Sequence, residues 1–159
     1  MTYRIAGLSI EPFAHLFALD DAALAARNAR RVTATASRGF PCRVSLEDAR
    51  EGDELILLSH TSHDVATPYR STYAIYVRSG AVPAEYVDAT PPVFEGRPLG
   101  LRGFDAEGNL RDARLALPGE ADAKIRDLLA NPAIAYIDAH NAAHGCFSAR
   151  VERHGDASC

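Results

Sequence analysis

The chain has 159 residues, of which 47% are hydrophobic and 24% are charged, and its formal net charge is −4. This balance is typical of a folded globular protein, and the length suits one domain over residues 1–159, since two separate cores would each be small. The negative charge argues against a general nucleic-acid binder, which needs a basic face, so we expect no nucleic-acid partner.

The N-terminus lacks the basic start, unbroken apolar run and small-residue cleavage site of a secretory signal. No stretch approaches the length of a membrane span, so we expect a cytoplasmic protein with no membrane partner. In that compartment the cysteines, Cys42, Cys146 and Cys159, are expected to be reduced. Cys159 ends a polar segment, and residues 155–159 are expected to form a flexible tail.

The first third of the chain predicts a strand, a helical segment and a loop. Residues 3–10 alternate and carry branched side chains, which is typical of a strand. Residues 11–32 have a helical composition, and Asp20 and Asp21 are capping residues that can divide the segment into two helices. A loop over residues 33–41 follows, marked by glycine and proline, and residues 42–46 then predict a short strand.

The remaining two thirds predict mainly strands. Residues 54–60 form a near-continuous apolar run, which favours a central strand, and residues 61–71 are polar and long enough for a functional loop. Alternating patterns separated by turn residues predict further strands and two hairpins. Besides 54–60, we expect strands at 72–79, 99–104, 110–117, 133–140 and 146–153, and one helix at 118–132.

The order of these elements predicts the fold class. Consecutive strands joined by short turns favour antiparallel pairing, and strands and helices segregate along the chain instead of alternating. The prediction is an α+β fold with a mostly antiparallel sheet, with a curled or barrel-like sheet as one option. An N-terminal helical segment and one later helix would flank the sheet.

The segment HNAAHGCFSARVER, residues 140–153, holds the densest group of chemically active side chains. His140, His144 and Cys146 could converge on zinc from a loop, but zinc needs three or four ligands. The usual spacing of paired cysteines is absent, so no metal and no other cofactor is predicted. A further zinc ligand would have to come from Cys42, His60 or His63.

Cys146 is also a candidate nucleophile or redox thiol. A thiolate needs a nearby cation, which Arg150, His140 or His144 could supply, with Cys42 as a resolving thiol if the fold brings it near. The alternative is that both cysteines are small buried hydrophobic residues. Asn141, in the same segment, suits either a ligand contact or a tight turn.

Arginines on or beside predicted strands form a second candidate group. Sixteen of the seventeen basic residues are arginine, and arginine grips carboxylate and phosphate groups in a bidentate manner. A buried arginine must be paired or bind an anion, whereas acidic neighbours on the surface could equally satisfy it. The predicted anion-binding residues are Arg43, Arg70, Arg102, Asn141 and Arg150.

Four segments together resemble a bacterial family known as domain of unknown function 1203. They are RGFPCRVSLEDAREGDELILLSH, TPYRSTYAIYVR, RPLGLRGFDAEGNLRDA and AYIDAHNAAHGCFSARVER. The resemblance implies a small, single-domain, cytoplasmic protein and implies no activity. It marks as typical of the family Cys42, Arg43, Pro68, Tyr69, Arg70, Arg102, Asn141, Gly145, Cys146 and Arg150. His140 and His144 are less typical, since tyrosine often replaces the second, which weakens a metal site further.

Two functional hypotheses remain open, and they leave open whether the protein is an enzyme. The first is an arginine-lined pocket that binds a small anion such as a carboxylate or phosphate. The second is a thiol-dependent enzyme or redox protein in which Cys146 is the nucleophile, assisted by His140 or Cys42. A homodimer without a small-molecule site is a third alternative.

Overall fold

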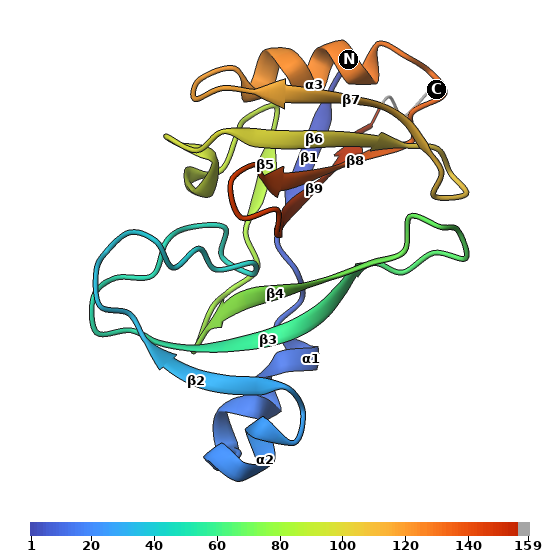
Figure 1. The fold of residues 1–159 in the computed structure, drawn as a ribbon. Helices are drawn as coiled ribbons and strands as arrows, with labels where there is room; N and C mark the ends of the chain where they lie inside the picture. The colour runs from blue at the N-terminus through green and yellow to red at the C-terminus, as the bar shows by residue number, and fades with distance from the viewer. Residues whose placement is uncertain (156–159) are drawn as a thin grey trace.

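The computed structural model describes residues 1–155, which form two open antiparallel sheets (Figure 1). The six-stranded sheet has the order β5-β1-β9-β8-β6-β7, and the three-stranded sheet has the order β2-β3-β4. The strands of the first sheet are β5 (Glu85–Val87), β1 (Tyr3–Ala6), β9 (Phe147–Arg153), β8 (Tyr136–Asn141), β6 (Leu99–Phe104) and β7 (Leu110–Ala116). Those of the second sheet are β2 (Ala29–Thr33), β3 (Glu54–His63) and β4 (Ser71–Arg78).

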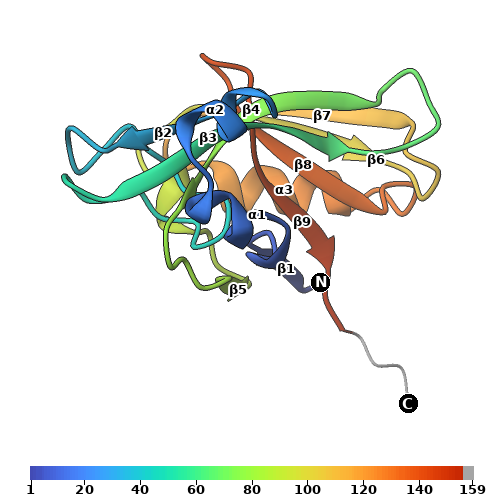
Figure 2. The ribbon, with the colours of Figure 1, turned by 90° about the horizontal axis from the view of Figure 1, so that it is seen from below.

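The helices are short and lie on the outer sides of the sheets. α3 packs along the six-stranded sheet, and Figure 2 shows the N-terminal helices over the three-stranded sheet. In chain order the helices are α1 (Glu11–Ala14), the 3₁₀ helix η1 (His15–Ala18), α2 (Asp21–Ala25), the 3₁₀ helix η2 (Pro92–Phe94) and α3 (Ala121–Leu129). None of the helices within residues 1–155 is long and apolar enough to cross a membrane.

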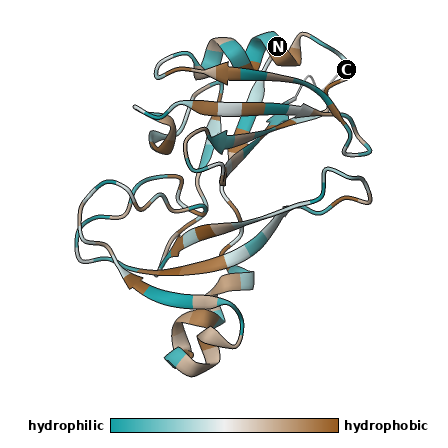
Figure 3. Ribbon diagram, viewed as in Figure 1, coloured by the Kyte–Doolittle hydropathy of each residue, from teal (hydrophilic) through white to brown (hydrophobic). Residues whose placement is uncertain are grey.

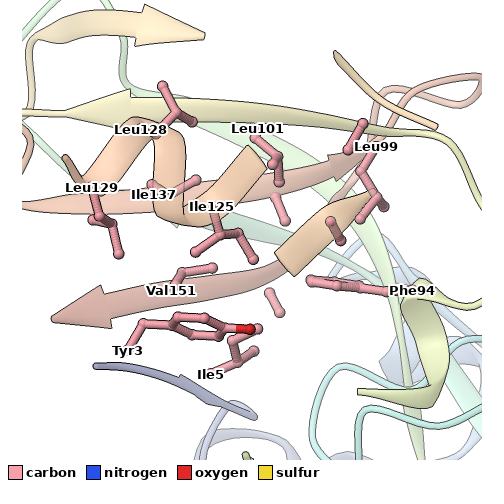
Figure 4. Close-up of a cluster of buried hydrophobic side chains, with 14 of the residues drawn as sticks. Tyr3, Ile5, Phe94, Leu99, Leu101, Ile125, Leu128, Leu129, Ile137 and Val151 are labelled. Atoms are coloured by element: carbon pink, nitrogen blue, oxygen red, sulfur yellow. The ribbon is translucent and has the colours of Figure 1, made fainter. Parts of the chain in front are cut away.

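Each sheet has its own hydrophobic core. Buried side chains of α3 are spaced so that they face one side of the helix, and they pack on the six-stranded sheet (Figure 4). The residues in this contact include Ile125, Leu128 and Leu129 of the helix and Leu101, Ile137 and Val151 of the sheet. The second core joins β3 and β4 to the N-terminal helices, and Figure 3 shows the hydrophobic bands on these strands.

Direct contacts hold the two sheets against each other. Gly7, directly after β1, lies against the backbone of Val44, and a Cβ at Gly7 would be 1.8 Å from the Val44 carbonyl oxygen. The neighbouring Leu8 N–H donates to the carbonyl of Arg43 at 2.9 Å. At the far end of β3, a 2.8 Å hydrogen bond joins His63 Nε2 to the hydroxyl of Tyr136 in β8. The contacts of Gly7 and Leu8 fix the position of the segment around Arg43.

The α+β class and the mostly antiparallel pairing are confirmed, because every pairing between the named strands is antiparallel. The barrel-like option is not supported, since both sheets are open. The helical segment predicted for residues 11–32 is divided where Asp20 caps α2, with its Oδ1 accepting from Ala23 N–H at 2.8 Å. The predicted end of this helical segment, at residue 32, was wrong. Residues 29–33 form the strand β2, because they pair with β3.

The strand predicted for residues 42–46 was also wrong. The chain turns back on itself there, with the Leu46 N–H donating to the Cys42 carbonyl at 3.0 Å. Only isolated bridges form around it, Pro41 with Asp48 and Cys42 with Tyr76. β5 was not among the predicted strands. Most of the expected flexible tail, residues 156–159 with Cys159, lies outside the described residues.

Candidate functional site

A pocket of about 420 Å³ lies between the two sheets. Leu57, Ala74 and Tyr76 of the three-stranded sheet form one wall. The turn between β8 and β9 faces them, and the segments around Arg43 and Arg97 close the sides. Both sheets and two loops therefore contribute to one concave surface.

Cys146 lines this pocket, and its sulfur accepts two hydrogen bonds. Arg43 Nη2 donates to Sγ at 3.2 Å, and Asn141 Nδ2 donates at 3.5 Å. The cysteine is half-buried and is not in a disulfide. Because both contacts come from N–H groups, they stabilise negative charge on the sulfur.

Arg43 is a buried charge, with only 2% of its surface exposed. Its Nε donates to the Phe147 carbonyl at 2.8 Å, and its Nη1 donates to the Pro41 carbonyl at 2.5 Å. Burial lowers the pKa of the Arg43 guanidinium, and the charge and hydrogen bond of Cys146 oppose that shift. Within residues 1–155 no carboxylate forms a salt bridge with Arg43, so Cys146 is the side chain that can balance its charge.

The turn that carries Cys146 is held by its own backbone. Asn141 N–H donates to the Cys146 carbonyl at 2.9 Å, and Gly145 N–H donates to the Asn141 carbonyl at 2.7 Å. Gly145 has a φ of 77°, in the left-handed region that glycine adopts most easily. A register shift at Ala139 and His140 precedes the turn. The bulge and the turn together direct the sulfur toward Arg43.

In the side-chain amide of Asn141, the nitrogen has a hydrogen-bond partner within residues 1–155 and the oxygen has none. The residue is 7% exposed, and its Nδ2 donates to Cys146 Sγ. Its Oδ1 is buried, and the described part of the chain offers it no hydrogen-bond partner. A buried acceptor without a donor is unfavourable, so this oxygen is a candidate contact for a bound group.

Within residues 1–155, neither His140 nor His144 hydrogen-bonds to the sulfur of Cys146. His140 is buried, its Nδ1 lies 2.9 Å from the Gly145 carbonyl oxygen, and its ring meets Tyr73 edge-on. Burial lowers the pKa of His140, and the nearby charge of Arg102 acts in the same direction. His144 is exposed at the pocket lining. Among residues 1–155 no cluster of three metal-ligating side chains is found.

The four arginines predicted to form one anion pocket lie at separate places. Arg70 is exposed and pairs with Asp64. Arg150 makes a bidentate pair with buried Asp138, at 2.7 and 3.1 Å, and lies over the Tyr136 ring. Arg102 lies over the ring of Phe104, 5.5 Å from its centroid. Of the four, only Arg43 lines the pocket.

Arg97 is a pocket residue that was not among the predicted site residues. It makes a bidentate pair with Asp48, at 2.7 and 2.9 Å, so its charge is balanced. The only sequence signal was its place at the start of RPLGLRGFDAEGNLRDA, one of the segments that carry the family resemblance. Nothing in that stretch indicates that residues 97–98 lie beside residues 39–43, because this proximity is made by the tertiary fold.

Cys42 lies in the second hydrophobic core and is fully buried. Its Sγ accepts a hydrogen bond from Arg78 N–H at 3.3 Å. Its environment is that of a small buried hydrophobic residue, and Cys42 does not line the pocket.

The family model described as protein of unknown function (DUF1203) matches residues 39–153. The chain belongs to this family. The matched range of DUF1203 includes every residue that lines the pocket, from Gly39 to Cys146, whereas β1, the N-terminal helices and β2 lie before it. No curated protein and no solved structure matches the chain.

Proposed function

We propose that this DUF1203 protein performs thiol-dependent chemistry, with Cys146 as a nucleophilic thiolate that attacks a small electrophile in the pocket. The observation that carries the proposal is the contact between Arg43 and Cys146 Sγ. Arg43 is a buried cation, and the sulfur is the group beside it that can become an anion. A thiolate, not a thiol, is the form of cysteine that reacts.

The energetics of burial favour a charged sulfur. An unpaired buried charge costs several kcal/mol, so Arg43 needs a counter-charge. A hydrogen bond to a charged partner contributes about 1.5–3 kcal/mol, roughly twice that of a neutral one. The two donors on Cys146 therefore stabilise the thiolate much more than the thiol.

The pocket supports a small substrate. Its volume of about 420 Å³ falls in the lower part of the range of about 300–1,000 Å³ that is typical of small-molecule sites. Cys146 is partly exposed and lines the pocket, which is what attack by its sulfur on a bound molecule requires. His140, first considered as an assisting residue, bonds to the Gly145 carbonyl instead, and Arg43 and Asn141 take the supporting role in this proposal.

Anion binding is the second candidate, and the same buried cation favours it. If Cys146 were a neutral thiol, the charge of Arg43 would require a bound carboxylate or phosphate. The two functions exclude each other at this site, because one positive charge needs one counter-charge. The short distance between Arg43 Nη2 and Cys146 Sγ favours the thiolate.

Alkylation of the native protein with iodoacetamide at neutral pH tests the proposal. Mass spectrometry of the digested protein gives a separate rate for Cys146 and for Cys42. We expect native Cys146 to react faster than the same cysteine in denaturant, and Cys42 to react only after unfolding, because it is fully buried. Labelling of native Cys146 that is slower than in the unfolded chain would contradict the proposal.

The variant Cys146→Ala separates the two candidates. If the thiolate balances Arg43, wild-type protein gains no thermal stability from phosphate or acetate, whereas the variant does, because its cation then lacks a partner. If the pocket binds anions beside a neutral thiol, both proteins are stabilised to the same extent. Equal stabilisation would therefore favour anion binding.

A further inference from the structure

We propose that the electrophile is an organic hydroperoxide with a small apolar substituent, and that Cys146 is oxidised to a sulfenic acid. This inference rests on the proposed function, since it requires a reactive Cys146.

The walls of the pocket favour an uncharged, apolar substrate body. Pro41, Leu57, Ala74, Pro98, Ala142 and Ala143 supply apolar surface. The one arginine in the lining besides Arg43 is Arg97, and Asp48 balances its charge. With the thiolate opposite Arg43, neither of these two arginines has an unbalanced charge for an anionic substrate. Of the polar lining residues, Arg43 and Asn141 contact the sulfur, whereas Tyr76 and His144 lie elsewhere in the lining.

The hydrogen-bonding groups at the sulfur suit a product that carries a hydroxyl. Arg43 has five N–H donors, and three of them bond to Phe147, Pro41 and Cys146, which leaves two without a partner within residues 1–155. Asn141 Oδ1 is a buried acceptor that lacks a donor within residues 1–155. The oxygen of a sulfenic acid can accept from Arg43, and its O–H can donate to Asn141 Oδ1.

The reaction is a two-electron transfer from sulfur to the peroxide. The thiolate attacks the terminal oxygen of R–O–O–H, the S–O bond forms, and the O–O bond breaks with its electron pair leaving on RO⁻. A proton from solvent converts RO⁻ to the alcohol, so Cys–S⁻ + ROOH + H⁺ gives Cys–SOH + ROH. The free N–H groups of Arg43 stabilise the charge that develops on the leaving oxygen.

A peroxide matches the groups at the sulfur better than an acyl substrate. Release of an acyl group from cysteine requires a base that activates water. Within the described residues the hydrogen bonds to Cys146 Sγ come from N–H donors alone, Arg43 and Asn141. Attack on a peroxide needs a thiolate, which the proposed function assigns to Cys146, and N–H donors, which Arg43 and Asn141 supply.

The test uses the full chain with the substitution Cys159→Ser, so that the C-terminal thiol does not react. Cumene hydroperoxide and hydrogen peroxide are compared at equal concentrations, and the sulfenic acid at Cys146 is trapped with dimedone and located by mass spectrometry. We expect cumene hydroperoxide to react about tenfold faster than hydrogen peroxide, or more. Binding of its apolar group in an apolar pocket should raise the rate by at least about that factor. Cys146→Ser should abolish formation of the alcohol.

Asn141→Ala tests the contact proposed for the product. It should shorten the lifetime of the sulfenic acid about tenfold, the effect expected when one such hydrogen bond is lost. Asn109→Ala, in the β6–β7 turn, is the matched control and should leave the lifetime unchanged. An unchanged lifetime in Asn141→Ala would overturn the proposed contact.

The two proposals fail in different ways. Fast alkylation of Cys146 by iodoacetamide together with peroxide reaction no faster than that of free cysteine would overturn the hydroperoxide inference and leave the proposed function standing. Equal rates with both peroxides would overturn the inference that the substrate carries an apolar substituent. Slow reaction with both iodoacetamide and peroxide would overturn the proposed function itself.

Discussion

Arg43 and Cys146 are 103 positions apart in the chain, yet Arg43 Nη2 lies 3.2 Å from Cys146 Sγ. The backbone of Arg43 is held on both sides, since Leu8 N–H, two residues after β1, donates to its carbonyl and its own N–H donates to the Tyr76 carbonyl in β4. Cys146 comes from the turn between β8 and β9. The junction of the two sheets therefore creates the pair.

Arg43→Gln should slow the alkylation of Cys146 by about 10–100-fold, because it removes a charged hydrogen bond worth roughly 1.5–3 kcal/mol to the thiolate. The rate is measured with iodoacetamide at neutral pH, and circular dichroism checks that the variant is folded. Arg70→Gln is the matched control, since Arg70 is exposed and lies outside the pocket. A folded Arg43→Gln variant with the wild-type rate would remove the role assigned to Arg43.

Gly7→Ala should destabilise the protein by about 3 kcal/mol or more, because its Cβ would lie 1.8 Å from the Val44 carbonyl oxygen and the backbone would have to move. Urea denaturation measures the change in the free energy of unfolding. Gly100→Ala is the control, since a Cβ there meets nothing within 4 Å, and it should change stability by at most about 1 kcal/mol. Similar stabilities of the two variants would show that the approach of Gly7 to Val44 is not a constraint.

Tyr136→Phe should lower the free energy of unfolding by about 1–3 kcal/mol, because it leaves buried His63 Nε2 without its partner. Tyr69→Phe removes a hydroxyl that has no hydrogen bond in residues 1–155, so a change of only about 0.5 kcal/mol is expected. Chemical denaturation of both variants tests whether this bond helps to hold the two sheets together. Equal losses would argue against that role.

Stability should fall as the pH is lowered through the histidine range. Burial lowers the pKa of His140 and of His60 below the usual value of 6.5. Because the unfolded chain then binds more protons at these positions, the free energy of unfolding decreases as the pH falls through 6.5. Urea denaturation across this range measures the slope. His140→Gln should reduce it, and an unchanged slope would contradict this assignment.

The sequence alone was sufficient to predict the elements whose apolar residues follow a clear pattern. The apolar run of β3, the alternation of β4 and the hairpin of β6 and β7 were each predicted near their observed positions. β2 was missed because Arg30, Arg31 and Val32 follow a helix without a break in composition, and only pairing with β3 makes them extended. Residues 42–46 alternate like a strand, but long-range contacts bend them into a turn.

The candidate site was predicted only in part, for a similar reason. The segment 140–153 and Arg43 were both selected from the sequence, yet their contact depends on how the sheets meet. Arg70, Arg102 and Arg150 were grouped with Arg43 by residue type alone, and local pairs such as Asp138 with Arg150 could not be foreseen from spacing. Side chains that bond across 103 positions leave no periodic trace in a single sequence.

The ultraviolet absorbance of the thiolate tests the charge on Cys146 most directly. The spectrum of wild-type protein at neutral pH is compared with that of Cys146→Ser, and the difference counts thiolates at this position. A difference equal to one thiolate per chain is predicted, because Arg43 and Asn141 donate to the sulfur. Identical spectra at neutral pH, with a difference that develops only under alkaline conditions, would contradict the charged pair on which the proposed function rests.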